Sequence, residues 1–220
     1  MAELTFQARV ESLTSISIAT SPSPTELTQF LIDACNDIAR KMKDLDPTSL
    51  DLYATVAVDQ DAAFTVQGLF LYAELRDGTA GVYHMCEEIS PRTARLYLDT
   101  NSLYKATYIN PKAYIIEGAV KTIPAMTSVY EMNVAYFIAD TTLDYNSTTI
   151  IKFPKNMYHA VALYASILTV ENYMSNELVA NKDSDMYKLA MSLKQDLTRD
   201  YESIFATLIK QREQKWEYKH

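Results

Sequence analysis

Histidine and cysteine are the side chains best suited to metal binding or nucleophilic chemistry, and this sequence has three histidines and two cysteines. His84 and Cys86 lie two positions apart in a β-rich stretch, so both would face one side of a strand. His159 falls in a helical stretch and His220 is the last residue, so no histidines have the i, i+4 spacing of paired imidazole ligands. We interpret His84 as a core or surface residue and His159 as a packing or hydrogen-bonding residue. The spacing therefore predicts no metal site and no cofactor.

The two cysteines and the segment Asp59-Gln60-Asp61 are likewise interpreted without a chemical role. Cys35 and Cys86 lie far apart and form no C-x-x-C motif, which predicts small buried side chains rather than a disulfide. Asp59 and Asp61 flank Gln60, a pattern that could bind calcium. It lacks the glycine and the distal glutamate of an EF-hand loop, so we interpret the three residues as a solvated loop.

Sequence motifs of common enzyme classes are absent as well. The sequence contains no G-x-G-x-x-G, no G-x-x-x-x-G-K-[ST] and no G-x-S-x-G. It therefore predicts no catalytic residues and a protein that is not an enzyme. An enzyme that uses dispersed carboxylates stays an alternative, and it would need two carboxylates brought together with separated pKa values.

Composition and charge restrict the class of protein. The chain has 220 residues, 48% of them hydrophobic, and a net charge of −8, which predicts one large or two small folded domains. The segment from Asp44 to Ile150 accounts for all of this net charge, because it contains 14 acidic residues and 6 basic ones. An acidic balance argues against gripping nucleic acid, although DNA could pass such a protein without being held. The longest apolar run, Ala160–Val170, is too short to cross a bilayer, and the first residues show no secretory signal, so we expect a soluble intracellular protein.

Helical periodicity marks the elements that would carry these residues. The stretch Ile150–Val179 has two neighbouring apolar stripes that cover most of a helix, which predicts a central helix beginning near Pro154. Ser23, Pro24 and Glu26 form a capping box that opens a helix ending near Lys43. A short helix is expected over 4–13. A long amphipathic helix is expected over 185–217, joined to the central helix by residues 181–184 in an αα-hairpin. Its predicted buried stripe is Met186, Leu189, Leu193, Leu197, Tyr201, Ile204 and Leu208.

The middle of the chain is predicted to form β structure, because it has short apolar runs separated by turn residues. The expected strands are 53–58, 64–75, 81–89, 112–116, 119–123 and 129–138, with a turn at Asp77-Gly78 and another at Glu117-Gly118. Residues 91–99 would form a short helical or irregular link. The predicted fold class is α+β: a helical bundle with a C-terminal tail from residues 1–49 and 150–220, and an inserted antiparallel β subdomain, a small sandwich or curled sheet, from residues 50–149.

Three segments in this order resemble the head-to-tail connector (adaptor or neck) proteins of tailed bacteriophages. They are the helix TQFLIDACNDIARKM, the β segment SLYKATYINPKAYIIEGAVKTIPAM and the helix opening FPKNMYHAVALYASILTVENYM, which precedes a long C-terminal helix. The resemblance covers about Glu26–Tyr201 and rests on architecture, because no single motif is diagnostic.

The resemblance implies a structural virion protein, assembled in the host cytoplasm, that forms a homo-oligomeric ring with twelvefold symmetry. Its partners would be further copies of itself, the portal protein and tail or nozzle proteins. DNA would pass through the channel without sequence-specific binding, and no membrane would be involved. The acidic β segment fits a lumen that repels DNA.

Other functions stay open at this stage. Another phage structural part, such as a capsid decoration or tail component, would share these features. So would a small-ligand binding or regulatory protein, which would need a deep apolar pocket with converging polar groups. The 16 tyrosines are typical of protein interfaces, although half-buried strand and helix faces also explain many of them. In the charged tail, Trp216 and Tyr218 could anchor a partner or could simply be solvated.

Overall fold

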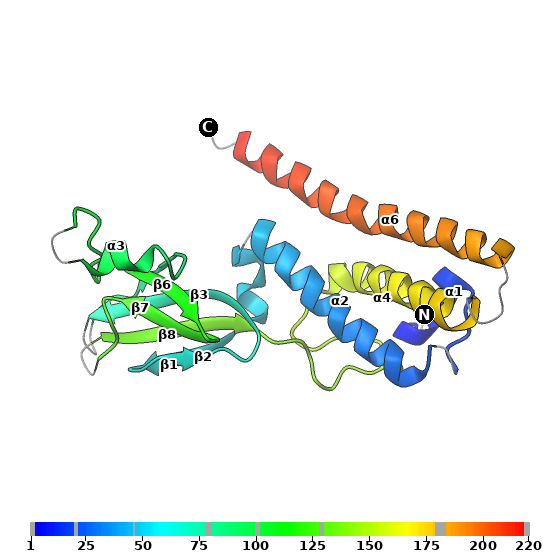
Figure 1. The fold of residues 1–220 in the computed structure, drawn as a ribbon, viewed down its shortest axis with the longest axis horizontal. Helices are drawn as coiled ribbons and strands as arrows, with labels where there is room; N and C mark the ends of the chain where they lie inside the picture. Colours follow the sequence, from blue (N-terminus) through cyan, green and yellow to red (C-terminus); the bar gives the residue numbers. More distant parts are fainter. Residues whose placement is uncertain are drawn as a thin grey trace. The chain divides into compact units, whose positions relative to one another are not determined.

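A computed structural model of the chain describes residues 3–19, 22–45, 47–77, 81–99, 102–127, 130–178 and 184–217. The chain forms two compact units. Residues Met1–Leu45 and Ala139–His220 make one, here called the helical unit, and residues Asp46–Ile138 make the other, the strand unit. The described residues have an α+β fold with five α-helices and two four-stranded sheets (Figure 1). The predicted fold class is therefore confirmed at this level.

The helical unit is built around the predicted central helix. Its elements are α1 (Phe6–Thr14), α2 (Pro24–Leu45), the 3-10 turn η2 (Lys155–Met157), α4 (Tyr158–Tyr173), the π-helical turn η3 (Met174–Leu178) and α6 (Ser184–Glu217). Helix α4 contacts α1, α2 and α6. Ten of its 16 residues are buried, so the prediction of a helix that is apolar nearly all round is confirmed. None of the described helices combines the length and the apolar character that crossing a membrane requires.

The capping box at the start of α2 is confirmed atom by atom. The backbone N–H of Ser23 donates to Glu26 Oε2 at 2.7 Å, and the backbone N–H of Glu26 donates to Ser23 Oγ at 3.3 Å. These hydrogen bonds from Ser23 lower the pKa of the Glu26 carboxyl. Asn172 on α4 donates to the other carboxylate oxygen at 3.1 Å, so the same side chain also links α2 to α4.

The face of α6 that packs in the structure differs from the predicted stripe. Its buried residues are Ala190, Leu197, Tyr201 and Phe205. Met186 and Leu189 are exposed, so the N-terminal part of the predicted stripe was wrong. The predicted steps of 3 and 4 keep the stripe on one face of the helix, but Met186, Leu189 and Leu193 line an apolar groove at this end of α6, so this part of the face is not closed by packed side chains. The connecting residues 181–183 lie outside the part of the chain that the structure describes.

The strand unit contains η1 (Pro47–Tyr53), β1 (Thr55–Gln60), β2 (Phe64–Thr65), β3 (Leu69–Asp77), β4 (His84–Met85), β5 (Glu87–Glu88), α3 (Ala94–Leu98), β6 (Lys112–Ile116), β7 (Ala119–Ile123) and β8 (Tyr130–Phe137). One sheet has the order β1-β8-β3-β4 and the other β2-β7-β6-β5. Side chains from both sheets share one core, including Leu75 and Val134 from the first and Ala113 and Val120 from the second. The prediction of an antiparallel subdomain needs one correction, because β5 pairs with β6 in parallel.

Two predicted strands are each divided between the two sheets. The stretch 64–75 splits into β2, which pairs with β7, and β3, which pairs with β8. The stretch 81–89 splits in the same way into β4 and β5. At the first break, a Cβ on Gly68 would lie 2.1 Å from the carbonyl oxygen of Phe137, so only glycine allows this close approach.

The predicted hairpin of β6 and β7 is confirmed at every position. Ile116 pairs with Ala119, and between them Glu117 and Gly118 have φ angles of 52° and 76°. Two consecutive residues with positive φ give the primed turn that suits the right-handed twist of a hairpin. The other predicted turn, at Asp77-Gly78, includes Gly78, which lies outside the described residues.

Candidate interaction surface

The histidines chosen from the sequence are not brought together. His84 is half-buried, and its ring contacts the Tyr108 ring at a centroid distance of 6.5 Å. His159, for which a packing or hydrogen-bonding role was expected, is exposed on α4, which contradicts the packing role. His220 lies outside the described residues. Among the residues that the structure does describe, no three His, Cys, Asp or Glu side chains are grouped closely enough to hold a metal ion.

Both cysteines are free and buried, which confirms their interpretation as small core side chains. Burial raises the pKa of the Cys35 thiol and of the Cys86 thiol to about 12. Because the thiolate is the reactive form of cysteine, neither side chain is prepared for nucleophilic chemistry at neutral pH.

Asp59 was interpreted as part of a solvated loop; it is exposed as expected, but it is not in a loop. It lies in β1 with a φ of 53°, next to an irregularity in the pairing of β1 with β8. Its Oδ1 accepts from Arg76 Nη2 at 2.9 Å and from the Tyr83 hydroxyl at 2.6 Å. Arg76 also pairs with Glu131, and this hydrogen bond raises the pKa of its guanidinium. One arginine thus holds two carboxylates, and these ion pairs link β3 to β1 and to β8.

The helical unit contains an apolar groove of about 500 Å³. It is lined by the segment 14–19, by Val170 and Tyr173 of α4, and by the first two turns of α6. The described lining residues are uncharged, and the polar ones among them are Thr14, Ser15, Ser17 and Tyr173.

The strand unit instead presents a surface built by the excursion between β5 and β6, residues 89–111. Ser90 opens it, accepting the backbone N–H of Thr93 with its carbonyl at 3.0 Å, and α3 follows. After α3 the chain returns against it, and the backbone N–H of Ala106 donates to the carbonyl of Tyr97 at 3.2 Å. The sequence prediction of a short helical or irregular link is therefore confirmed for this segment.

A small core of its own holds the excursion against the second sheet. Ala94, Ala106 and Ile123 are all buried to 4% exposure or less, and Tyr97 and Tyr114 pack against them. The contact between Tyr108 and His84 adds a second attachment, to the first sheet. Small side chains let α3 and the chain around Ala106 lie close to the strands, so these described parts of the excursion pack directly on the sheet.

Lys112 fastens the end of the excursion. It is only 4% exposed, and its Nζ donates to Glu87 Oε2 at 2.5 Å and to Asn110 Oδ1 at 2.8 Å. The same ammonium lies 5.4 Å from the centre of the Tyr97 ring. A buried cation is costly unless it is paired, and here a carboxylate, an amide and an aromatic face compensate it. Lys112 thus fixes the exit of the excursion to β5 and to α3.

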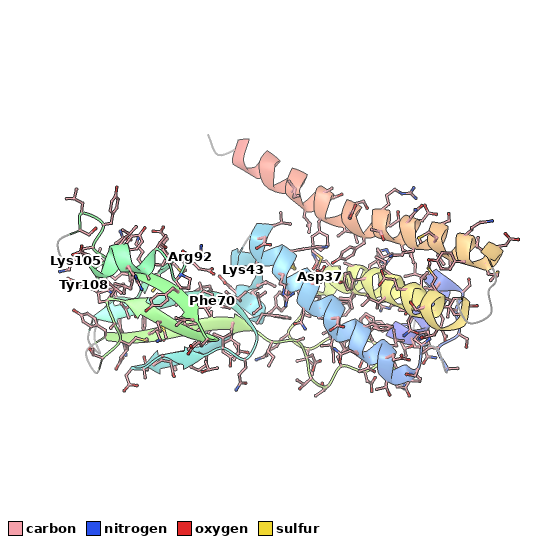
Figure 2. The ribbon with its side chains drawn as sticks, viewed as in Figure 1. Asp37, Lys43, Phe70, Arg92, Lys105 and Tyr108 are labelled. Carbon is pink, nitrogen blue, oxygen red and sulfur yellow. The ribbon has the colours of Figure 1, made fainter. Side chains whose placement is uncertain are left out.

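The large side chains of the excursion that are not in this core point to solvent. We call this surface the α3 platform and define it by the exposed apolar residues Leu96, Leu98, Leu103, Tyr104 and Ile109 and the exposed basic residues Arg92, Arg95 and Lys105. Leu103 is 101% exposed. Figure 2 shows Arg92 toward one end of α3 and Lys105 with Tyr108 toward the other. Several exposed large apolar side chains on one fixed segment mark a protein or membrane contact.

The charge of the α3 platform is opposite to that of the rest of the strand unit. Residues 90–112 contain four basic residues and one acidic residue, whereas residues 46–75 contain five acidic residues and no lysine or arginine. The sequence reasoning missed the platform because it counted charge over the whole segment 44–150. The signal was present as two arginines followed by Leu-Tyr-Leu in PRTARLYLD.

Comparisons with known proteins add no family assignment. No protein-family model matches the sequence. A search of curated proteins likewise gives no match. The function must therefore be argued from the site and from the resemblance described above.

Proposed function

We propose that this protein is a structural component of a tailed-phage virion, a head-to-tail connector that forms a ring between portal and tail with a channel for DNA. The α3 platform is the observation that carries the proposal. A protein that worked alone in solution would have little reason to hold five large apolar side chains in water on a segment fixed by its own core. A protein that works by fitting against other copies and neighbouring parts needs such a surface.

The proposal includes a finer description of the fold. Residues 1–49 and 150–220 form a helical bundle with a C-terminal αα-hairpin and tail, and residues 50–149 form the inserted β subdomain. The contacts of α4 with α1, α2 and α6 support the bundle. The order of the three quoted segments, helix, β hairpin and helix, supports the likeness to the connector family.

The partners in this proposal are further copies of the chain, the portal protein and tail or nozzle proteins. DNA passes without sequence-specific binding, because the strand unit carries 11 acidic and 6 basic residues and would repel a phosphate backbone. A ring in which these carboxylates all lie on the outer wall would contradict the repelling lumen.

Imaging of the purified protein tests the proposal directly. We expect electron microscopy to show ring-shaped particles with a central channel, either for the protein alone or after mixing with portal protein. Native mass spectrometry would give the number of copies, for which twelve is expected. Particles that remain single subunits in both conditions would contradict the connector function.

The groove of the helical unit supports one competing function, the binding of a small apolar ligand. Other virion parts, such as a capsid decoration or tail component, would also form symmetric assemblies. The same native mass measurement separates these functions, because a decoration protein would give a trimer or a monomer and a ligand-binding protein would gain the mass of its ligand.

A further inference from the structure

We propose that the α3 platform docks on the β1 edge of a second copy of this chain, in a head-to-tail contact. The β1 edge is defined as Leu52, Val56, Val58 and Asp61, which lie on η1, on β1 and just after it. This inference rests on the proposed function and adds to it the two surfaces that meet.

The β1 edge is the second exposed apolar surface of the strand unit. Strand β1 is the terminal strand of its sheet, since β8 is its only neighbour in the order β1-β8-β3-β4 of the described strands. Leu52 is 90% exposed, Val56 47% and Val58 58%. Val56 and Val58 are two positions apart, so they share one face of the strand. An exposed edge strand with an apolar face is a ready surface for another chain.

The two surfaces are complementary in charge. Arg92, Arg95 and Lys105 are exposed on the same segment as the apolar residues of the α3 platform. The β1 edge lies in a segment with no basic residue at all, and Asp61 is exposed at its end. The net charges of the two segments are therefore opposite: residues 90–112 have four basic residues and one acidic residue, the exposed Asp99, whereas the charged residues of 46–75 are all acidic. Such complementarity selects the partner surface and its orientation.

The positions of the surfaces favour a head-to-tail contact over a two-fold contact. Figure 1 shows α3 and β1 on opposite sides of the strand unit, with strands of both sheets between them. A contact between two different patches repeats from copy to copy, whereas a two-fold dimer would need one patch that fits itself. Two basic α3 platforms would repel each other, so self-pairing of the platform is disfavoured.

A mixed disulfide between two single-cysteine variants tests the contact in the full-length chain. One preparation carries Leu103→Cys and the other Val58→Cys, both at exposed positions. The native cysteines are buried, so the new thiols are the ones that react. Under mild oxidation we expect a cross-linked dimer to form in the equimolar mixture. We expect no cross-linked dimer when either variant is oxidised alone. Homodimers of Leu103→Cys that match or exceed the mixed product, or no mixed product at all, would overturn the inference.

Charge reversal supplies a second measurement with a matched control. Adding Arg95→Glu to the Leu103→Cys chain should lower the yield of mixed disulfide about fivefold, since it puts an acid against an acidic segment. Adding Asp61→Lys to the Val58→Cys chain should restore it. Lys121→Glu makes the same change of charge at an exposed site on β7, outside both surfaces, and should leave the yield unchanged. Equal effects of Arg95→Glu and Lys121→Glu would contradict a specific contact.

Electron microscopy distinguishes a failure of the proposed contact from a failure of the proposed connector function. If ring-shaped particles form but the mixed disulfide does not, the proposed surfaces are wrong while the connector function stands. If the disulfide forms and responds to charge as described but no closed ring is ever seen, the contact stands and the connector function fails.

Discussion

The helical unit and the strand unit use the same kinds of apolar side chain for different purposes. In the helical unit, Leu31 of α2 is 0% exposed, like Leu27 and Ile38 on the same face. In the strand unit, Leu103 is 101% exposed on the α3 platform. Burial of a leucine stabilises the fold by about 1.5–3 kcal/mol, so Leu103 contributes little of this in a single subunit. The comparison teaches that a leucine can serve the core at one position and remain available for a contact at another; the strand unit has a core of its own as well, with Leu75 and Val134 at 0% exposure.

The comparison is tested most strongly by the same substitution in both units. Leu31→Ala should lower the free energy of unfolding by about 3 kcal/mol, because it leaves a cavity in a packed interior. Leu103→Ala should change it by less than about 0.5 kcal/mol, because its side chain touches solvent. Urea unfolding followed by circular dichroism measures both. Similar losses at the two positions would mean that Leu103 is covered within the monomer, and the platform would lose its basis.

A second test concerns the close backbone approach at Gly68, between the end of β2 and the start of β3. Gly68→Ala should lower the free energy of unfolding by about 2 kcal/mol, since the new Cβ collides with the backbone carbonyl of Phe137. Gly118→Asn is the matched control, because nothing lies within 4 Å of a Cβ there and asparagine tolerates a positive φ. Thermal unfolding of the two variants gives the comparison. Equal stability would show that the chain passes between the sheets without this close approach.

A third test concerns the polar contact that holds α6 in the helical unit. The Tyr201 hydroxyl donates to Asp37 Oδ2 at 2.6 Å, and burial together with this carboxylate raises the pKa of the phenol. Tyr201→Phe keeps the ring contacts with Tyr164 and Phe205 and should cost about 1 kcal/mol, the net value of one hydrogen bond. Asp37→Asn keeps an acceptor and should cost less. If Tyr201→Phe has no effect in urea unfolding, α6 is held by packing alone.

The smallest expected effect depends on pH. Hydrogen bonds from Ser23 lower the pKa of Glu26, so its stabilisation is present above the unfolded-state pKa and is lost as pH falls through the lower folded-state pKa. Glu26→Gln should therefore lower the melting temperature at pH 7, and the difference from wild type should vanish in acid. Ser23→Ala should remove about 1 kcal/mol and most of the same pH dependence. A difference for Glu26→Gln that stays constant from pH 7 to acid would contradict this role.

Parts of the fold could be predicted because the signals are local. The start of α2 follows from Ser23 and Glu26, whose side chains reach their partners within one turn. The hairpin follows from Glu117-Gly118, since a two-residue turn with positive φ fixes the pairing of the strands that it joins. Predictions that needed a neighbour were less successful: His159 is exposed and so does not pack in the core, and Asp59, although exposed, lies on a strand and pairs with Arg76.

The sequence by itself determined the helices, the hairpin and the acidic balance of the middle segment, because periodicity, caps and composition act over short distances. Only the tertiary structure decided that two apolar runs each divide between two sheets, since alternation along a strand says which face is buried but not which sheet a strand joins. It also decided that Leu103 lies in water and Leu31 in the core. Exposure depends on what packs against a side chain, and those neighbours come from distant parts of the chain.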